Sequence, residues 1–211
     1  MATQAVAGHG DRPAEHAVQT ATGLSNTKLG MWAFLGSECL LFGALISTYI
    51  LYRGRGPEGL PDAIPHNHYD IPYTSVSSFV LLMSSLTMVL ALAAIQRGQH
   101  ERLRTWLMAT ALLGMVFIAG QVYEFTAFVK EGLSIKSSPA ASAFFTLTGF
   151  HGAHVTGGIL MLLSLFGMSL DGRLPTERAE VVELVGLYWH FVDIVWIIIF
   201  TVVYLIPLQS P

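Results

Sequence analysis

The stretch VVELVGLYWHFVDIVWIIIFTVVYLI, residues 181–206, is apolar over enough length to cross a lipid bilayer. A transmembrane helix needs about 20 predominantly apolar residues. The acidic and basic side chains of this stretch are Glu183, His190 and Asp193. The stretch therefore predicts a membrane-spanning helix, and its central His190 and Asp193 call for an explanation.

Similar stretches occur toward the amino terminus, separated by short polar segments in which glycine and proline break helices. They cover residues 29–52, 74–95, 103–129 and 139–170. Residues 1–28 are polar, without the basic start and apolar core of a secretory signal, and predict an amino-terminal tail. The predicted fold class is an all-α integral membrane protein, a bundle of five transmembrane helices within residues 29–211.

The composition agrees with this fold class. Of 211 residues, 53% are hydrophobic and 12% are charged, whereas soluble domains carry about 25% charged residues. Much of the surface must therefore face lipid. The net charge of -3 does not indicate a nucleic-acid partner, and the single Cys39 excludes an intrachain disulfide or a cysteine-based metal site.

The distribution of lysine and arginine predicts the orientation in the membrane, because cytoplasmic loops are enriched in these residues. With five spans, seven of these residues lie on the same side of the membrane as the amino terminus, and four lie on the opposite side. The first group is Arg12, Lys28, Arg97, Arg102, Arg104, Arg173 and Arg178; the second is Arg53, Arg55, Lys130 and Lys136. We expect a cytoplasmic amino terminus and a carboxyl terminus on the outer face.

Away from the ends of the predicted spans, the histidine, aspartate and glutamate side chains are Glu38, Glu124, His151, His154, His190 and Asp193. Each costs about 2.5–3.5 kcal/mol at the centre of a membrane helix, so these side chains should face helix interfaces and pair there. We expect Glu124 to pair with His151 or a nearby hydroxyl, and Glu38 with a partner near the bilayer midplane. Glu124, His151, His154, His190 and Asp193 are predicted to form a buried polar network.

Small and hydroxylated residues predict where helices meet. Gly149, Ala153 and Gly157 recur every four residues, a spacing that lets a neighbouring backbone approach closely. The serines and threonine of the second span are expected to form interhelical hydrogen bonds. They are Ser77, Ser78, Ser84, Ser85 and Thr87.

The residue pattern alone leaves two other functions open. Histidine and carboxylate side chains three residues apart on neighbouring helices are typical of di-metal bundles, so the six ionisable residues could be metal ligands. A proton channel or transporter using Glu38 or Asp193 is a second alternative. However, we find neither the paired repeats nor the interrupted helices common in transporters.

Four segments resemble cytochrome c oxidase subunit III. They are GSECLLFG at 36–43, GQVYEF at 120–125, GFHGAHVTGG at 149–158 and YWHFVDIVW at 188–196. The last two are the most specific, and all four occur in the order expected for the family. The chain is similar to the short, five-helix bacterial form, which lacks the first two of the seven helices of the long form.

The resemblance implies a non-redox accessory subunit of a respiratory haem-copper oxidase, without catalytic residues, metal or cofactors of its own. Haem and copper would reside in partner subunits. Subunit I would be the direct partner, with subunit II, a small subunit IV and a respiratory supercomplex as further associations. Bound phospholipid, support of proton uptake and a place in the bacterial cytoplasmic membrane are also implied. Glu38 corresponds to the family glutamate that reacts with carbodiimides, and the resemblance implies that it is linked to protons or to lipid. Cytochrome c is the favoured electron donor, and a quinol oxidase is the alternative.

Overall fold

A computed structural model describes residues 25–53, 71–130 and 132–206. The described residues form five long helices and confirm the predicted fold class. The helices are α1 (Asn26–Tyr52), α2 (Ile71–Gln96), α3 (His100–Lys130), α4 (Pro139–Leu170) and α5 (Ala179–Phe200). A 3-10 turn, η2 (Thr176–Arg178), precedes α5, and a π-helical turn, η3 (Thr201–Leu205), extends it.

The first three helices begin three residues before the predicted spans. In α1 the reason is a polar cap: the Ser25 hydroxyl accepts a hydrogen bond from the Lys28 amide at 3.2 Å. Such a cap satisfies an amide at the helix start and draws polar residues into the first turn. The predicted tail therefore ends too late by three residues, and residues 1–24 lie outside the described part of the chain.

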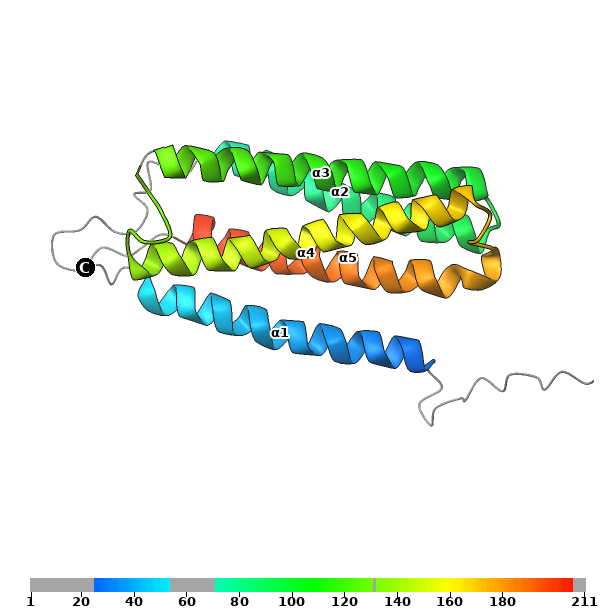
Figure 1. Cartoon of the computed structure of the whole chain (residues 1–211), viewed down its shortest axis with the longest axis horizontal. Coiled ribbons are helices and arrows are strands. Elements are labelled where there is room, and N and C mark those ends of the chain that lie inside the picture. Colours follow the sequence, from blue (N-terminus) through cyan, green and yellow to red (C-terminus); the bar gives the residue numbers. More distant parts are fainter. Residues whose placement is uncertain (1–24, 54–70, 131, 207–211) are drawn as a thin grey trace, which may run out of the picture.

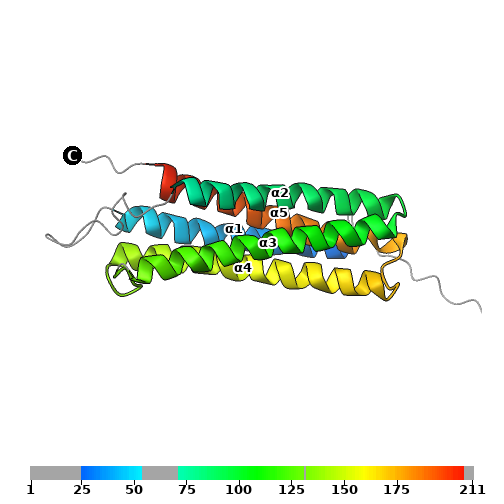
Figure 2. The ribbon, with the colours of Figure 1, turned by 90° about the horizontal axis from the view of Figure 1, so that it is seen from above.

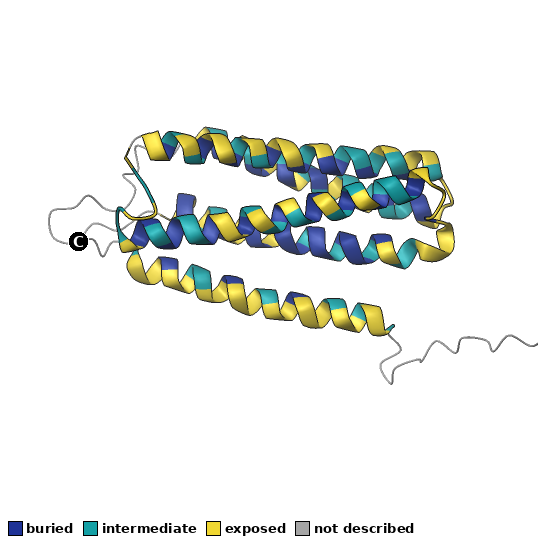
Figure 3. Cartoon of the chain, in the orientation of Figure 1, coloured by how far each residue is buried: buried dark blue, intermediate teal, exposed yellow. Residues whose placement is uncertain are grey.

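All five helices run along the long axis of the molecule (Figures 1 and 2). The hairpin of α2 and α3 packs on α5 and α4 respectively, and α4 also packs on α5. Helix α1 lies at the edge of the bundle against α4 and α5. Most of its side chains are exposed (Figure 3), so α1 offers a broad apolar surface to lipid or to another membrane protein.

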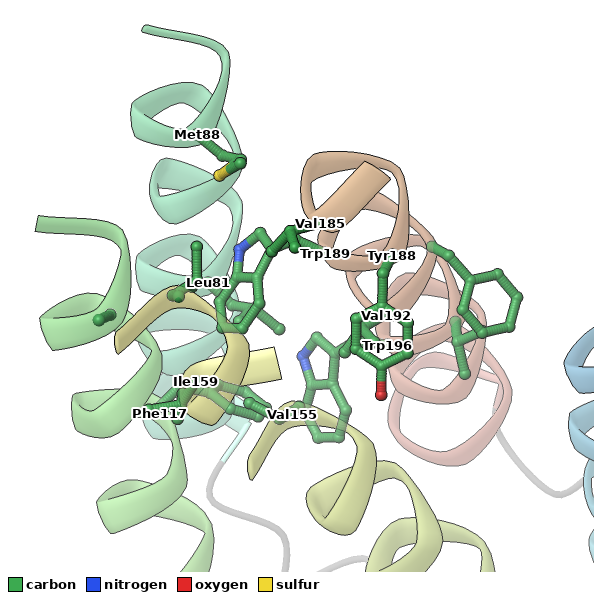
Figure 4. Close-up of a cluster of buried hydrophobic side chains, with 14 of the residues drawn as sticks. Leu81, Met88, Phe117, Val155, Ile159, Val185, Tyr188, Trp189, Val192 and Trp196 are labelled. Atoms are coloured by element: carbon green, nitrogen blue, oxygen red, sulfur yellow. The ribbon is translucent and has the colours of Figure 1, made fainter. Parts of the chain in front are cut away.

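The centre of the bundle is built around Trp189 and Trp196 of α5 (Figure 4). The Trp189 indole donates to the Ser84 hydroxyl at 2.9 Å, and the Trp196 indole donates to the Ser78 hydroxyl at 2.8 Å. These bonds satisfy the polar atom of each buried ring, as buried tryptophans require. The prediction that hydroxyls of the second span bond across helices is confirmed at both positions.

The close approach of helices occurs at glycines other than the predicted ones. A Cβ atom on Gly114 would lie 2.6 Å from the Trp189 ring, and one on Gly158 would lie 2.7 Å from it. A Cβ on Gly149 would meet nothing within 4 Å, and Ala153 is exposed. A Cβ on Gly157 would lie 3.6 Å from the Tyr188 hydroxyl, which is ordinary contact, so the predicted positions are less crowded than Gly114 and Gly158 and their role in packing stays a prediction.

Polar contacts at three levels hold α1 to the bundle. At its start, Lys28 pairs with Glu183 at 2.9 Å. At its end, the Arg53 guanidinium donates to the Val202 carbonyl at 2.7 Å and also to the Ile206 carbonyl. The third contact lies between these ends and forms the centre of the candidate site.

Candidate functional site

Glu38 of α1 and His154 of α4 form an ionisable pair inside the membrane region. The Glu38 Oε2 atom lies 3.1 Å from His154 Nε2, and the two side chains are only 15% and 17% exposed. The expectation that Glu38 has a partner near the midplane is met by this contact. The pair joins two of the sequence segments that carry the family resemblance.

The other ring nitrogen determines the chemistry of the pair. His154 Nδ1 lies 2.8 Å from the Phe150 carbonyl, which accepts only, so Nδ1 carries a hydrogen. A hydrogen bond between Nε2 and Glu38 then requires one further proton, on the imidazole or on the carboxyl group. The site can therefore hold one proton between a nitrogen and an oxygen atom.

Aromatic side chains surround this proton-holding pair. Phe42 meets the His154 ring edge-on at a centroid distance of 5.0 Å, and Tyr188 donates to the His154 carbonyl at 3.0 Å. The Tyr188 and His154 rings are nearly parallel, at 6.5 Å. These contacts limit water at the pair and fix the imidazole ring.

Glu124 lies in a second, separate polar cluster toward the other end of the bundle. Its carboxylate accepts from the Thr74 hydroxyl at 2.9 Å, from the Tyr204 hydroxyl at 3.1 Å and from the Gln121 amide at 3.4 Å. We expected Glu124 to pair with His151 or with a nearby hydroxyl. The hydroxyl partners are observed, whereas His151 bonds to the Val192 carbonyl instead. The cluster ties α2, α3 and η3 together.

His151 is fully enclosed between α3 and α5. Its Nε2 atom donates to the Val192 carbonyl at 3.2 Å, and its ring lies 4.9 Å from Trp196 and 6.0 Å from Phe117. Its Nδ1 atom has no hydrogen-bond partner among the described residues. His151 and His154 are three residues apart on α4, yet they contact different helices: His151 bonds to α5 and His154 to α1.

His190 and Asp193 face α2 from the middle of α5. His190 Nδ1 lies 2.6 Å from the Ser85 hydroxyl. Asp193 is 3% exposed, and its polar neighbour is the Ser85 hydroxyl, whose contact with the carboxylate falls outside ordinary hydrogen-bond geometry. A buried charge without a partner is costly, so this carboxyl group depends on its local environment more than the other five residues do.

The six predicted residues thus divide between separate sites. In the described part of the chain, no three histidine, cysteine, aspartate or glutamate side chains lie close enough to share a metal ion. The arrangement of these side chains does not favour the di-metal alternative.

Sequence reasoning missed Tyr204, Tyr188 and Arg53 as polar partners. Each contact joins residues far apart in the chain, such as Tyr204 with Glu124 or Arg53 with Val202. A tyrosine in an apolar span is an available signal, because a buried tyrosine hydroxyl needs a hydrogen-bond partner. Its partner, however, is set by helix packing.

The bundle and its intramembrane polar sites define a multi-pass helical membrane protein. All five helices are long and apolar enough to cross a bilayer. The family profile for cytochrome c oxidase subunit III matches residues 4–207. The chain belongs to this family.

Relatives from several bacteria agree with the assignment. Cytochrome c oxidase subunit 3 of Bacillus sp. (strain PS3) is 39% identical over 180 residues, which cover 85% of this chain and 86% of the relative. Quinol oxidase subunit 3 of Bacillus subtilis is 36% identical over 200 residues, covering 95% and 96%. Cytochrome bo(3) ubiquinol oxidase subunit 3 of Pseudomonas aeruginosa is 37% identical over 183 residues, covering 85% of each chain.

Proposed function

We propose that this chain is an accessory subunit of a respiratory haem-copper oxidase that reduces oxygen to water and pumps protons. Haem and copper reside in subunits I and II, and this chain binds beside subunit I and stabilises the complex. A small subunit IV and a respiratory supercomplex are further associations in this proposal. The family match over residues 4–207 is the observation that carries it.

The role of Glu38 is to hold a proton inside the membrane and to support proton uptake by subunit I. The shared proton required by the Glu38–His154 contact supports this role. Glu124, His151, His190 and Asp193 serve mainly to orient helices. For Glu124 and His190, the bonds to side chains of other helices support this role.

The chain lies in the bacterial cytoplasmic membrane with its amino terminus inside. The surplus of lysine and arginine at the end of the bundle where α1 begins supports this orientation. Phospholipid occupies part of its exposed apolar surface, which includes most of α1.

Cytochrome c is the favoured electron donor, and quinol is the second candidate. Relatives with both kinds of name match at similar identity, 39% and 36–37%, so identity does not discriminate between them. The discriminating measurement is oxygen consumption by the purified complex with reduced cytochrome c or with a quinol.

The proposal is tested by isolating the chain with its partners. An affinity tag on this chain, with gentle detergent extraction of native membranes, should recover a complex with haem bands in the reduced-minus-oxidised spectrum and with bound copper. Recovery of the chain without haem-containing partners from membranes that show oxidase activity would contradict the proposal.

A further inference from the structure

A cavity at the turn between α2 and α3 is lined by arginines on one part of its wall and by apolar side chains on the rest. Gly98 adopts φ +69°, and the amides of Gly98 and Gln99 close the end of α2 by bonding to the Ile95 and Ala94 carbonyls at 3.0 and 2.9 Å. This helix-ending motif lets α3 begin at once and turn back along α2. The cavity, of about 260 Å³, lies beside this turn and is lined by residues of α2, the turn and α3.

The polar part of the cavity wall is basic. Arg97 and Arg102 line it together with Gln99 and Thr105. Arg102 donates to Gln99 at 3.1 Å, and neither arginine has a carboxylate partner among the described residues. By contrast, Lys28 and Arg104 at the same end of the bundle are paired with glutamates. The two arginines of the cavity thus keep their charge available to an anion.

The remaining wall is apolar and extends into the membrane region. Leu90, two alanines of α2 and Trp106 of α3 form it. Arg102 and Trp106 are four residues apart, so they lie on one face of α3, with the arginine nearer the helix end. Tryptophan and arginine in this order are typical of the boundary between lipid headgroups and acyl chains.

We propose that this cavity binds the headgroup of an anionic phospholipid, such as phosphatidylglycerol. Guanidinium groups pair well with phosphate oxygens, and the apolar wall suits the start of an acyl chain. The cavity is smaller than the range of about 300–1,000 Å³ that encloses drug-sized ligands, so it takes the headgroup and leaves the chains along α2 and α3. A free phosphate ion would not use Leu90 or Trp106.

The test uses the oxidase complex purified through a tag on this chain and depleted of lipid. A phosphatidylglycerol analogue with a photoreactive acyl chain should label the peptides that contain Leu90 and Trp106. Excess phosphatidylglycerol should abolish the labelling, whereas phosphatidylcholine or inorganic phosphate at the same concentration should not. Equal competition by phosphatidylcholine, full competition by inorganic phosphate, or label absent from both peptides would overturn the proposal.

Paired variants separate the site from general surface charge. The Arg97→Gln/Arg102→Gln double variant should weaken phosphatidylglycerol binding about 25-fold, from roughly fivefold per arginine near a membrane surface. The control, Arg173→Gln/Arg178→Gln, removes two charges from the same end of the bundle but outside the cavity, and should retain the labelling. Equal effects of the two double variants would overturn the proposal. The wild-type competition experiment decides the matter even if a variant assembles poorly.

Discussion

A hydrogen bond between Glu38 and His154 needs one proton between the two side chains, because of one neighbouring atom. The hydrogen on His154 Nδ1 is donated to the Phe150 carbonyl. His154 Nε2 therefore either donates to the Glu38 carboxylate or accepts from a protonated Glu38 carboxyl group. Uptake or loss of this proton changes the charge of the pair between α1 and α4.

Glu38→Gln tests this role. The Gln amide can still donate to Nε2, so assembly should persist and the free energy of unfolding should change by less than about 1 kcal/mol. The variant cannot exchange the carboxyl proton, so proton-pumping efficiency or the number of turnovers before inactivation should fall. Protons pumped per electron and long-term oxygen consumption measure these quantities.

Glu101→Gln is the matched control, because its carboxylate is 91% exposed at the start of α3. It should leave both quantities unchanged. A Glu38→Gln complex that pumps and survives like the wild type would exclude a functional role for the carboxyl group.

Asp193→Asn tests whether its buried carboxyl group needs a charge. No cation among the described residues pairs with Asp193, and asparagine preserves its shape. We expect the thermal midpoint of the complex to change little, with a cost below about 1 kcal/mol. A loss of about 3–5 kcal/mol would instead show that the carboxyl group is charged and paired, which would contradict this expectation.

The sequence predicted that the buried ionisable side chains would have polar partners, but it predicted only some of those partners correctly. The cost of burying charge predicted that Glu38 and Glu124 would have partners, and both do. It did not predict that His151 would bond to the Val192 backbone or that Asp193 would have no hydrogen-bond partner in the described chain. Helical spacing gives the face of a residue, whereas its partner depends on how neighbouring helices are rotated.

At the scale of the helices, α1 and α5 are opposite cases. Helix α5 lies at the centre of the bundle and places two tryptophans in its core, whereas α1 buries little and depends on polar contacts at its start, middle and end (Figures 3 and 4). We therefore expect α1 to be the first helix to separate from the bundle.

The contacts of Trp189 predict how a methyl group added at Gly158 changes the stability of the bundle. Gly158→Ala places a Cβ atom against the fully buried Trp189 ring, whose hydrogen bond to Ser84 hinders its movement. We expect a loss of about 1–3 kcal/mol in the unfolding free energy, as for other overpacked cores. Thermal unfolding in detergent would measure it.

Gly149→Ala on the same helix is the control. Its Cβ would meet nothing within 4 Å, so alanine should be neutral or stabilise α4 by up to about 1 kcal/mol through helix propensity. Destabilisation at Gly149 and tolerance at Gly158 would contradict the packing described for α4.

Apolar length predicted the helices well because a membrane span is a property of a continuous segment. Both ends of α4 agree with the predicted span. Helix α1 begins earlier than predicted, because the Ser25 cap allows the polar residues after it to be helical. The spacing of Gly149, Ala153 and Gly157 did not predict the most crowded positions, because only Gly157 of the two glycines has a neighbour within 4 Å of a Cβ, at 3.6 Å. The glycines against Trp189 belong to two helices and form no repeat in the sequence.

At the scale of the molecule, the five helices place the described ends, Ser25 and Ile206, at opposite ends of the bundle (Figure 1). With the basic surplus near the start of α1, we expect a protease to remove an amino-terminal tag only in inside-out vesicles. A carboxyl-terminal tag should be cleaved only in spheroplasts. The reverse pattern of cleavage would show that the proposed orientation is wrong.

The central claim is that this chain supports redox chemistry located in other subunits. The most direct measurement is to strip the chain from the purified oxidase and determine haem, iron and copper in both fractions, with the oxygen-consumption rate of the remainder. We predict that haem and copper stay with the remaining subunits, which begin turnover normally but inactivate sooner. Iron or copper retained by the separated chain, with activity lost at once from the remainder, would contradict the claim and place a redox centre among its histidines and carboxylates.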